Sequence, residues 1–362
     1  MRVRVCSPIR SRTGRAEFGR ILVNQLVQAG HQVTVKAADA ETPTGDYGAL
    51  GAQAERLRGD DTGAQINLVN APPQQFAAQR LEGAVNIGFS AWPVDRLAED
   101  AVAACNAMDA IWVPSQWSLE VHRRSGVTVP VQVVGADAAP TPVGVPAGGP
   151  MRLLSVVEWS ARRNPVGLLR AYCAAFDGAS NVVLTLKAHR AADTGSSQEF
   201  VNAAIARVLR RVTPRRGLPR IEIATDLFSE AQMRHLHGSC HAYVSLSHGE
   251  SWGLGAWDAT LAGKPVVHTG WSAPMEYLHP QGLVAASTSP VFGMKDAGPG
   301  YDQSMNWGEP HLDDAIARLR DLRTDYDRWL RASREHRNVI NNRYSLERRI
   351  EQLQAALREL VA

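Results

Sequence analysis

The sequence predicts an α/β fold built from two doubly wound, Rossmann-like domains in series. Short apolar runs alternate with longer segments of helical period, which is the pattern of strand–helix units that form a parallel sheet. The 362 residues suit two domains. Proline-rich residues 137–150 have no apolar periodicity and separate two such series. We therefore expect domains at 1–136 and 151–340, a linker at 137–150, and a last helix at 341–362 that packs back towards the N-terminal domain.

In the first domain, apolar runs predict six strands, at Val3–Cys6, Gln32–Val35, Ile66–Val69, Val85–Phe89, Ala110–Val113 and Val131–Val134. Helical periodicity predicts helices at Phe18–Ala29, Arg96–Asn106 and Ser115–Arg124. The first of these helices has apolar residues on one face and ends before Gly30, a common helix terminator.

The same patterns recur after the linker. Strands are expected at Arg152–Val157, Val182–Leu186, Ile221–Ala224, Ala242–Ser247 and Pro265–His268. Helices are expected at Pro165–Phe176, Gln198–Arg211 and Gly253–Ala262, with another capped by Ser229. Beyond Leu312 the chain predicts two or three helices, the last at Ser345–Val361. Parallel sheets bind ligands at the carboxyl ends of their strands, so two such domains facing each other would form a deep cleft.

Composition excludes several classes of protein. With 44% hydrophobic and 21% charged residues, the chain is neither a disordered tail nor a fibre. It has no apolar window of membrane-spanning length, and its first residues lack the apolar core of a signal peptide, so we expect a cytoplasmic protein. The 4 cysteines form no CxxC pair, which favours a reducing compartment and argues against a structural zinc.

Arginines are concentrated near the N-terminus. Within the first twenty residues one acid, Glu17, accompanies six arginines, at positions 2, 4, 10, 12, 15 and 20. Arg2 and Arg4 alternate along a predicted strand. Arg10, Arg12 and Arg15 fall in the following loop, which we expect to face the cleft.

The most informative segment is 248–267, HGESWGLGAWDATLAGKPVV. It follows a strand and opens a helix, with glycines at 249, 253 and 255. Glycines let the backbone approach an anion closely, and free N–H groups at a helix start attract negative charge. Glu250 precedes the helix and Asp258 lies inside it, so the two carboxylates are placed to hold hydroxyl groups at either end of a ligand such as a nucleotide sugar. The alternative, that Glu250 and Asp258 act as a paired general acid and base, is the weaker interpretation.

This segment resembles the signature of the retaining glycosyltransferases of family 4, which have the GT-B fold. The resemblance rests on Glu250, seven residues, Asp258, then residues 262–267 and Glu276. The family usually has Glu at both ends of the spacer, so Asp258 is a conservative departure. Segments 111–115 and 307–310 also resemble family segments, which extends the similarity through most of the chain.

The resemblance implies roles for individual residues. Glu250 would bind hydroxyls of the donor sugar, Asp258 would bind the ribose, and the diphosphate would lie on the backbone of Ser251, Trp252, Gly253 and Leu254. His248 and Gly249 are further donor-site candidates. Trp252 is equally consistent with a packing role, and His248 with a structural one. His235, His237 and His241 are expected at surface or core positions, and we expect no metal site.

A second basic element lies at 159–165, WSARRNP, ahead of a helix. Family members place an arginine and a lysine in this loop to bind the diphosphate. Here Arg163 falls at the lysine position, whereas Glu158 occupies the arginine position. Arg162 or Lys187 is the candidate for the missing cation.

The acceptor is expected in the N-terminal domain. The loop Arg12, Thr13, Gly14, Arg15 lies where similar enzymes have a glycine loop, and the cleft histidine of many relatives has no counterpart in segment 86–95. Ser90 and Asp95 in that segment are candidates for acceptor contacts. A glycan, small metabolite, protein, lipid or modified nucleic acid all remain open as the acceptor.

We therefore expect a retaining, metal-independent glycosyltransferase that uses a UDP- or GDP-sugar as co-substrate and holds no permanent cofactor. Closure of the two domains about the linker would exclude water. One alternative is the same reaction on an anionic acceptor, such as a phospholipid or a modified base in DNA, because loop arginines suit phosphate. The other is a GT-B protein without transferase activity, such as a nucleotide-sugar epimerase or a binding protein.

Overall fold

The computed structural model describes residues 1–39, 46–139, 144, 146–189, 197–212, 216–293 and 300–361. The chain divides into two compact units. Unit 1 comprises Met1–Ala139, Ser229–Ala231 and Asn341–Ala362, and unit 2 comprises Pro140–Phe228 and Gln232–Ile340. Residues 140–143 and 145 of the expected linker lie outside the described residues.

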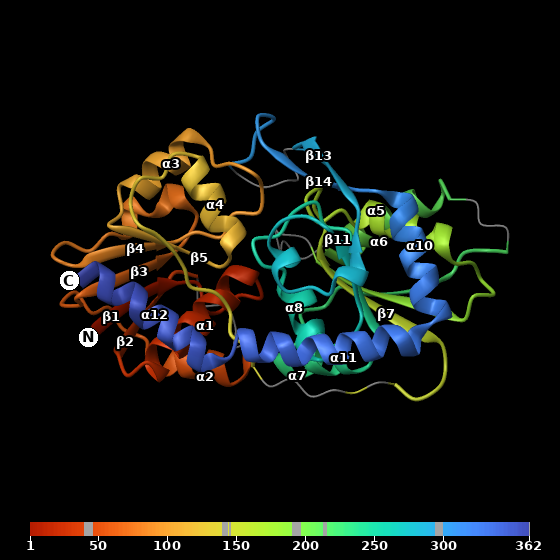
Figure 1. The fold of residues 1–362 in the computed structure, drawn as a ribbon, viewed down its shortest axis with the longest axis horizontal. Helices are drawn as coiled ribbons and strands as arrows, with labels where there is room; N and C mark the ends of the chain where they lie inside the picture. Colours follow the sequence, from red (N-terminus) through yellow and green to blue (C-terminus); the bar gives the residue numbers. More distant parts are fainter. Residues whose placement is uncertain are drawn as a thin grey trace. The chain divides into compact units, whose positions relative to one another are not determined.

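A six-stranded parallel sheet forms the centre of unit 1 (Figure 1). Its strands, in the spatial order β2-β1-β3-β4-β5-β6, are β2 (Gln32–Ala37), β1 (Arg2–Ser7), β3 (Ile66–Asn70), β4 (Val85–Phe89), β5 (Ala110–Val113) and β6 (Val131–Val133). Val5 of β1 pairs with Val35 of β2 and with Leu68 of β3. The strand order reverses between β1 and β3, which is where open parallel sheets usually bind ligands.

The helices of unit 1 are α1 (Gly14–Gln28), α2 (Gly48–Arg56), α3 (Glu99–Asn106), α4 (Gln116–Arg124) and α12 (Leu346–Val361), with short 3-10 turns at Pro73–Gln75 and Ala77–Gln79. In Figure 1, α12 lies beside α1, and Nε2 of Gln354 donates to the carbonyl of Ala29 over 3.4 Å. Arg349 of the same helix donates to the carbonyl of Ala136 over 3.0 Å. The C-terminal helix is therefore part of unit 1.

Helices α1 and α2 of unit 1 differ from the sequence-based expectation, and α3 begins at Glu99 rather than at Arg96. Helix α1 begins at Gly14 rather than Phe18, because the Thr13 side chain accepts from the amide of Ala16 and caps the first turn. Gly14 and Arg15 therefore belong to the helix and not to the preceding loop. Helix α2 was not expected: only Gly51 and Ala54 are buried, so it lacks a wide apolar stripe.

Unit 2 also contains a parallel six-stranded sheet. Its strands, in the spatial order β12-β11-β10-β7-β8-β9, are β12 (Leu283–Val284), β11 (Val266–Thr269), β10 (Ala242–Ser245), β7 (Met151–Glu158), β8 (Val182–His189) and β9 (Arg220–Ala224). An antiparallel pair, β13 (Ala286–Pro290) and β14 (Asn306–Pro310), is separate from this sheet and was not expected. The strand order of the main sheet reverses between β7 and β10.

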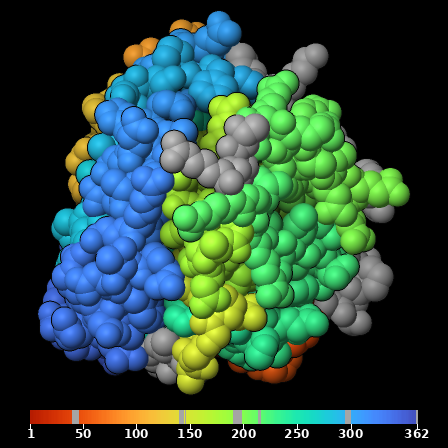
Figure 2. Space-filling model, turned by 90° about the vertical axis from the view of Figure 1, so that its right-hand side faces the viewer, coloured from red at the N-terminus to blue at the C-terminus, as the bar shows by residue number. Residues whose placement is uncertain are grey.

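The helices around this sheet are α5 (Pro165–Ala175), α6 (Ser197–Leu209), α7 (Glu230–Gly238), α8 (Leu254–Leu261), α10 (Leu312–Thr324) and α11 (Tyr326–Arg343), with 3-10 turns at Ala273–Glu276 and Pro280–Gly282. Arg320 of α10 donates to the carbonyl of Ala174 at the end of α5 over 2.7 Å. Figure 2 shows this face of unit 2, with α10 in blue next to the yellow-green segment that includes α5. The two parallel sheets with flanking helices confirm the expected α/β fold with two Rossmann-like domains.

Two basic side chains have structural roles. Arg4 of β1 is 4% exposed, and its Nε donates to Asp60 over 2.7 Å. Lys264, from the segment that resembles the family motif, is 1% exposed and donates to the carbonyls of Gly238 and Cys240. Lys264 therefore holds the end of α7 against the start of β11. None of the helices in the described ranges combines the length and apolarity needed to cross a membrane.

Four buried histidines predict that the stability depends on pH. Burial lowers the pKa of His122, His237, His248 and His268 to about 4 in each case, against the 6.5 of an exposed imidazole. Between these values the unfolded chain binds more protons than the folded chain, so folding is favoured less as the pH falls. The free energy of unfolding, measured by denaturant titration, should decrease from pH 6.5 towards pH 4. The substitution His122→Gln should reduce that slope between pH 6.5 and 5, and an unchanged slope would contradict this explanation.

Candidate functional site

The candidate site of unit 2 lies where the strand order of its sheet reverses. The loop after β7 contains Arg162 and Arg163, and the loop after β10 contains Glu250. Because β7 and β10 are parallel neighbours, both loops leave the sheet at the same edge. Residues that are 87 positions apart in the sequence are thereby brought into contact.

Hydrogen bonds join these two loops. Asn164 adopts a left-handed conformation with φ 48°, caps α5 through the amide of Gly167, and donates to the carbonyl of Leu246 over 3.0 Å. The amide of His248 donates to the carbonyl of Arg162 over 2.8 Å. Nη1 of Arg162 donates to the carbonyl of Gly249 over 2.9 Å. Apart from the bond donated by Arg162, these contacts hold the backbone on both sides of the site without the charged side chains.

Glu250 forms ion pairs with both arginines. Nη1 of Arg163 donates to Oε1 of Glu250, and Nη1 of Arg162 lies 3.5 Å from Oε2. The Glu250 side chain is 6% exposed, so this charge is largely removed from water. Burial, together with the adjacent Arg162, lowers the pKa of Arg163 to about 9. Two cations share the Glu250 carboxylate, and the charge of Glu158 also acts on Arg163. The two guanidinium groups are the charged donors that an anion could use here.

The start of α8 provides further hydrogen-bond donors beside this cluster. Gly253 caps the helix with φ 89°, a conformation that favours glycine. Within the described part of the chain, the amides of Ser251, Gly253 and Leu254 donate to no acceptor. Free amides at a helix start carry partial positive charge and can bind phosphate. Arg162, Arg163 and these amides can together hold a diphosphate.

Aromatic packing fixes the loop that leads into α8. Trp252 is 1% exposed, and its ring centroid lies 5.1 Å from that of Trp257 and 4.9 Å from that of Tyr277. The Tyr277 hydroxyl lies within hydrogen-bond distance of the carbonyls of Trp252 and Gly253, at 2.8 and 2.9 Å. Of the two roles considered for Trp252, packing is the one that these contacts support.

The other donor-site candidates of unit 2 differ in how much of each side chain is exposed. His248 is 1% exposed, stacks on Trp307 with ring centroids 4.6 Å apart, and contacts the Gly308 carbonyl through Nδ1 over 3.0 Å. Lys187, in β8, is 5% exposed and its Nζ lies 5.2 Å from the centre of the Phe228 ring. The Asp258 side chain is 52% exposed, with Oδ2 4.0 Å from Nε2 of His237. Donor contacts by these three residues remain predictions.

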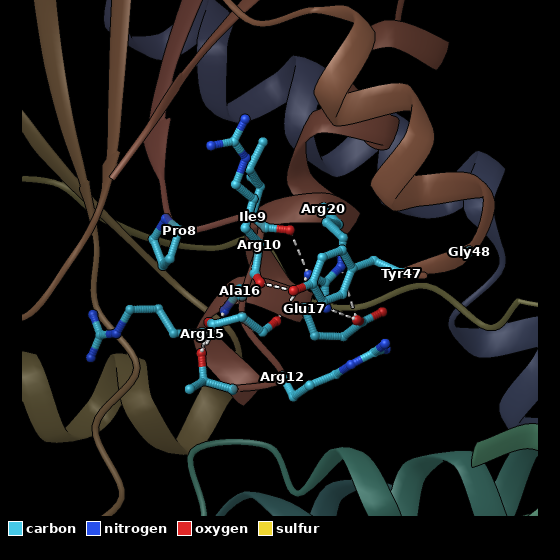
Figure 3. A network of polar contacts seen from close by, with 12 residues as sticks. Pro8, Ile9, Arg10, Arg12, Arg15, Ala16, Glu17, Arg20, Tyr47 and Gly48 are labelled. Atoms are coloured by element: carbon cyan, nitrogen blue, oxygen red, sulfur yellow. Dashed lines mark hydrogen bonds and ion pairs between the residues drawn. The ribbon is translucent and has the colours of Figure 1, made fainter. Parts of the chain in front are cut away.

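Two arginines at or near the loop after β1 in unit 1 already have acidic partners, and Figure 3 shows one of these pairs, between Arg20 of α1 and Glu17. Arg10 donates to both carboxylate oxygens of Glu55, over 2.6 and 3.1 Å. Arg20 is 3% exposed and binds Glu17 over 2.5 Å and the Ile9 carbonyl over 2.8 Å. Arg10 is thereby held by α2, and the expectation that its loop faces the cleft stays a prediction.

Residues 12–15 lie at the junction of this loop and α1, Arg12 and Thr13 in the loop and Gly14 and Arg15 in the first turn of the helix. The Arg12 guanidinium lies 4.4 Å from the centre of the Tyr47 ring and donates to the Asp46 carbonyl over 2.6 Å. Thr13 and Gly14 are exposed. In Figure 3 the guanidinium of Arg15 points away from Tyr47. The exposed residues at the start of α1 are available for a ligand, but their acceptor role is untested.

Ser90, at the end of β4, has an internal partner. Its side chain is completely buried, and its Oγ lies 2.8 Å from Nε2 of His122. Nδ1 of His122 contacts the Ser118 carbonyl over 2.6 Å, so the imidazole bridges β4 and α4. Asp95 is half-buried after the buried Trp92. Acceptor contacts by Ser90 and Asp95 stay predictions.

Sequence reasoning missed three residues that shape the site in unit 2: Asn164, Ser272 and Tyr277. A signal for Asn164 was available, since Asn followed by Pro165 is a common helix start. Ser272 and Tyr277 contact the 250–253 loop from more than twenty positions away, so no local pattern identifies them. Among the described residues, no group of three or more His, Cys, Asp or Glu side chains could hold a metal ion.

Comparison with solved structures shows the fold of this chain. Anabaena HepE, solved with UDP and glucose, matches with a TM-score of 0.70 at 13% identity, over 99% of this chain and 100% of that one. Sucrose-phosphate synthase from Thermosynechococcus elongatus matches at 0.67 and 13% identity, over 100% and 99%. S. aureus TarM, solved with UDP, fondaparinux and α-GlcNAc-glycerol, matches at 0.60 and 12% identity over 80% of this chain. The chain spans 54% of the TarM chain.

These structures are two-domain GT-B proteins, and the two parallel six-stranded sheets of this chain match that fold. Comparison with protein-family models gives no match, and neither does comparison with curated proteins. The GT-B fold of this chain is therefore shown by its similarity to solved structures.

The ion pairs of Glu250 predict an unusual effect on anion binding. The carboxylate of Glu250 competes with any diphosphate for Arg162 and Arg163, so Glu250→Gln should bind inorganic pyrophosphate about tenfold more tightly, or about 1.4 kcal/mol. Calorimetric titration would measure the affinity. The matched control is Glu222→Gln, because Glu222 is also paired with two arginines, Arg152 and Arg220, on another part of the sheet. Equal gains in both variants, or none for Glu250→Gln, would contradict a diphosphate site here.

Proposed function

We propose that this protein is a glycosyltransferase that moves a sugar from a UDP- or GDP-sugar to an acceptor. The observation that carries the proposal is the cluster of Glu250, Arg162 and Arg163 beside the free amides at the start of α8. It places cations and N–H donors for a diphosphate next to a buried carboxylate. The similarity to HepE, whose structures contain UDP, glucose and UDP-glucose, supports a nucleotide-sugar donor.

In this proposal the diphosphate is the leaving group. It binds the amides of residues 251–254 and the guanidinium groups of Arg163 and Arg162, which stabilise the negative charge that develops as the bond to the sugar breaks. Glu250, released from Arg163 by the incoming diphosphate, accepts hydrogen bonds from hydroxyls of the sugar. The exposed Asp258 accepts from the ribose hydroxyls. Lys187 supplies a further positive charge at the end of β8.

We further propose a retaining reaction of the family 4 type. The acceptor oxygen bonds to the anomeric carbon on the face that the diphosphate leaves, and its proton passes to a departing phosphate oxygen. No protein nucleophile is needed for this route. Because arginines and helix amides balance the charge of the diphosphate, the reaction does not require a divalent cation.

For the acceptor we propose the start of α1, with Arg12, Thr13, Gly14 and Arg15. Arg10 forms an ion pair with Glu55, and Arg20 forms one with Glu17. Fewer arginines near the N-terminus are therefore available for an anionic acceptor than the six in the sequence suggest. A neutral glycan or small metabolite is therefore favoured over a phospholipid or nucleic acid. Weak dependence of acceptor affinity on salt would agree with this choice, because phosphate contacts are strongly screened.

The donor is identified first by thermal shift against a panel of UDP- and GDP-sugars. A ligand that binds only the folded state raises the unfolding temperature. We expect one nucleotide sugar to stabilise the protein more than its free nucleotide does, and slow release of that sugar to water. Stabilisation by no nucleotide sugar would contradict the proposal. Binding without sugar release or transfer would indicate a binding protein, and conversion of the bound sugar to its epimer would indicate an epimerase.

The role of Glu250 is tested by Glu250→Ala. This variant should lose at least about a hundredfold in turnover with the best donor, a cost typical of removing one key polar group from a site of this kind, while its circular dichroism stays unchanged. The control is Glu222→Ala, which removes a paired carboxylate elsewhere in the unit and should keep activity. Near-normal transfer by Glu250→Ala would refute the assigned role.

Independence from a divalent cation has its own test. Purified protein treated with excess EDTA should transfer or hydrolyse the donor at close to its untreated rate. A loss of activity that Mg²⁺ or Mn²⁺ restores would show that a metal ion, rather than Arg162 and Arg163 alone, balances the diphosphate.

A further inference from the structure

Ser272 has a backbone conformation that side chains rarely adopt. It lies between β11 and the 3-10 turn Ala273–Glu276, with φ 62° and ψ −160°. That region is essentially restricted to glycine, because a Cβ atom is crowded there, and non-glycine residues persist in it mainly where the surrounding structure or a function requires them. The residue is 3% exposed, so the strain is held inside the protein.

The side chain of Ser272 makes one contact that glycine could not make. Its hydroxyl oxygen accepts from the backbone amide of Glu250 over 3.0 Å. Glu250 is 5% exposed, so without this hydroxyl its amide would lose its acceptor in a place with little access to water. In this strained conformation, Ser272 therefore accepts a hydrogen bond from the amide of Glu250, the residue that pairs with Arg162 and Arg163.

The segment after Ser272 holds the same loop from the other side. The Tyr277 hydroxyl contacts the carbonyls of Trp252 and Gly253, and a Cβ atom on Gly253 would lie 3.4 Å from the ring of Pro274. Ser272 therefore acts at the first residue of this loop and Tyr277 at its end. Between them the amides of Ser251 and Gly253 remain available for a ligand.

We propose that Ser272 is a positioning residue: its hydroxyl fixes the backbone at Glu250 so that the carboxylate faces the two arginines and, when donor is bound, the sugar. This inference rests on the proposed function for its consequence in the reaction, although the hydrogen bond itself does not. Ser272 touches neither phosphate nor sugar in this role and acts only through Glu250.

Two substitutions separate the hydrogen bond from the strain. Ser272→Gly removes the hydroxyl and also relieves the backbone strain. Ser272→Ala removes the hydroxyl but leaves the backbone strain in place. Hydrogen exchange measured by mass spectrometry should show at least tenfold faster exchange at the Glu250 amide in both variants. Ser272→Gly should unfold at a temperature equal to or above that of the wild type, and Ser272→Ala below that of Ser272→Gly. Unchanged protection of the Glu250 amide in both variants would overturn the proposal.

The functional consequence is measured by binding. The ratio of the dissociation constant of the free nucleotide diphosphate to that of its nucleotide sugar reports recognition of the sugar. In both Ser272 variants this ratio should fall severalfold towards that of Glu250→Gln, because sugar recognition weakens and the free nucleotide meets less competition from the Glu250 carboxylate for Arg162 and Arg163. Adding Ser272→Gly to Glu250→Gln should change the ratio no further, since the serine acts through the carboxylate. A wild-type ratio in Ser272→Gly would overturn the positioning role.

The matched control is Asn181→Gly. Asn181 also has a positive φ, of 47°, but it is exposed and precedes β8 at the opposite end of that strand from Lys187 and His189. Relief of backbone strain at that position should leave the binding ratio unchanged. If the wild type binds no nucleotide sugar, the proposed function fails, and the hydrogen-exchange experiment still decides whether Ser272 holds the Glu250 backbone.

Discussion

The candidate site depends above all on the ion pairs between Glu250 and two arginines, Arg162 and Arg163, in the loop after β7. A carboxylate with 6% of its side chain exposed is costly to bury unless cations pair with it, and Arg162 and Arg163 provide both charge and directed N–H groups. The same arginines are the cations that a diphosphate needs. The cluster is therefore stable without a ligand because Glu250 takes the place that an anion would occupy, and ligand binding becomes an exchange of one anion for another.

The fold makes this arrangement possible by its strand order. The loops after β7 and β10 start from adjacent parallel strands, so residues far apart in the sequence meet without a long excursion of the chain. Each loop is then fixed by uncharged contacts: Asn164 to the carbonyl of Leu246, Tyr277 to the carbonyls of Trp252 and Gly253, and Ser272 to the amide of Glu250. These contacts keep the charged groups in place, so little reorganisation is needed when charge develops in a reaction.

Much of the fold was readable from the sequence because it depends on local patterns. Apolar runs located β4 and β5 to the residue, and the expected helix Ser115–Arg124 matches α4 except that Ser115 is its N-cap. Elements with weak local signals were missed: α2 buries only Gly51 and Ala54, and the strands β13 and β14 lack an apolar run. The candidate site divides in the same way. Glu250 and Arg163 were found from motifs, whereas the pairing of Arg10 with Glu55 and the contact from Ser272 join distant segments and leave no local pattern.

The most direct test of the account is a crystal structure of the protein with the nucleotide diphosphate that stabilises it most. We expect phosphate oxygens within hydrogen-bond distance of the amides of residues 251–254 and of the Arg163 guanidinium, with the Glu250 carboxylate released from Arg163. A nucleotide bound elsewhere, with the ion pair between Glu250 and Arg163 intact, would contradict it.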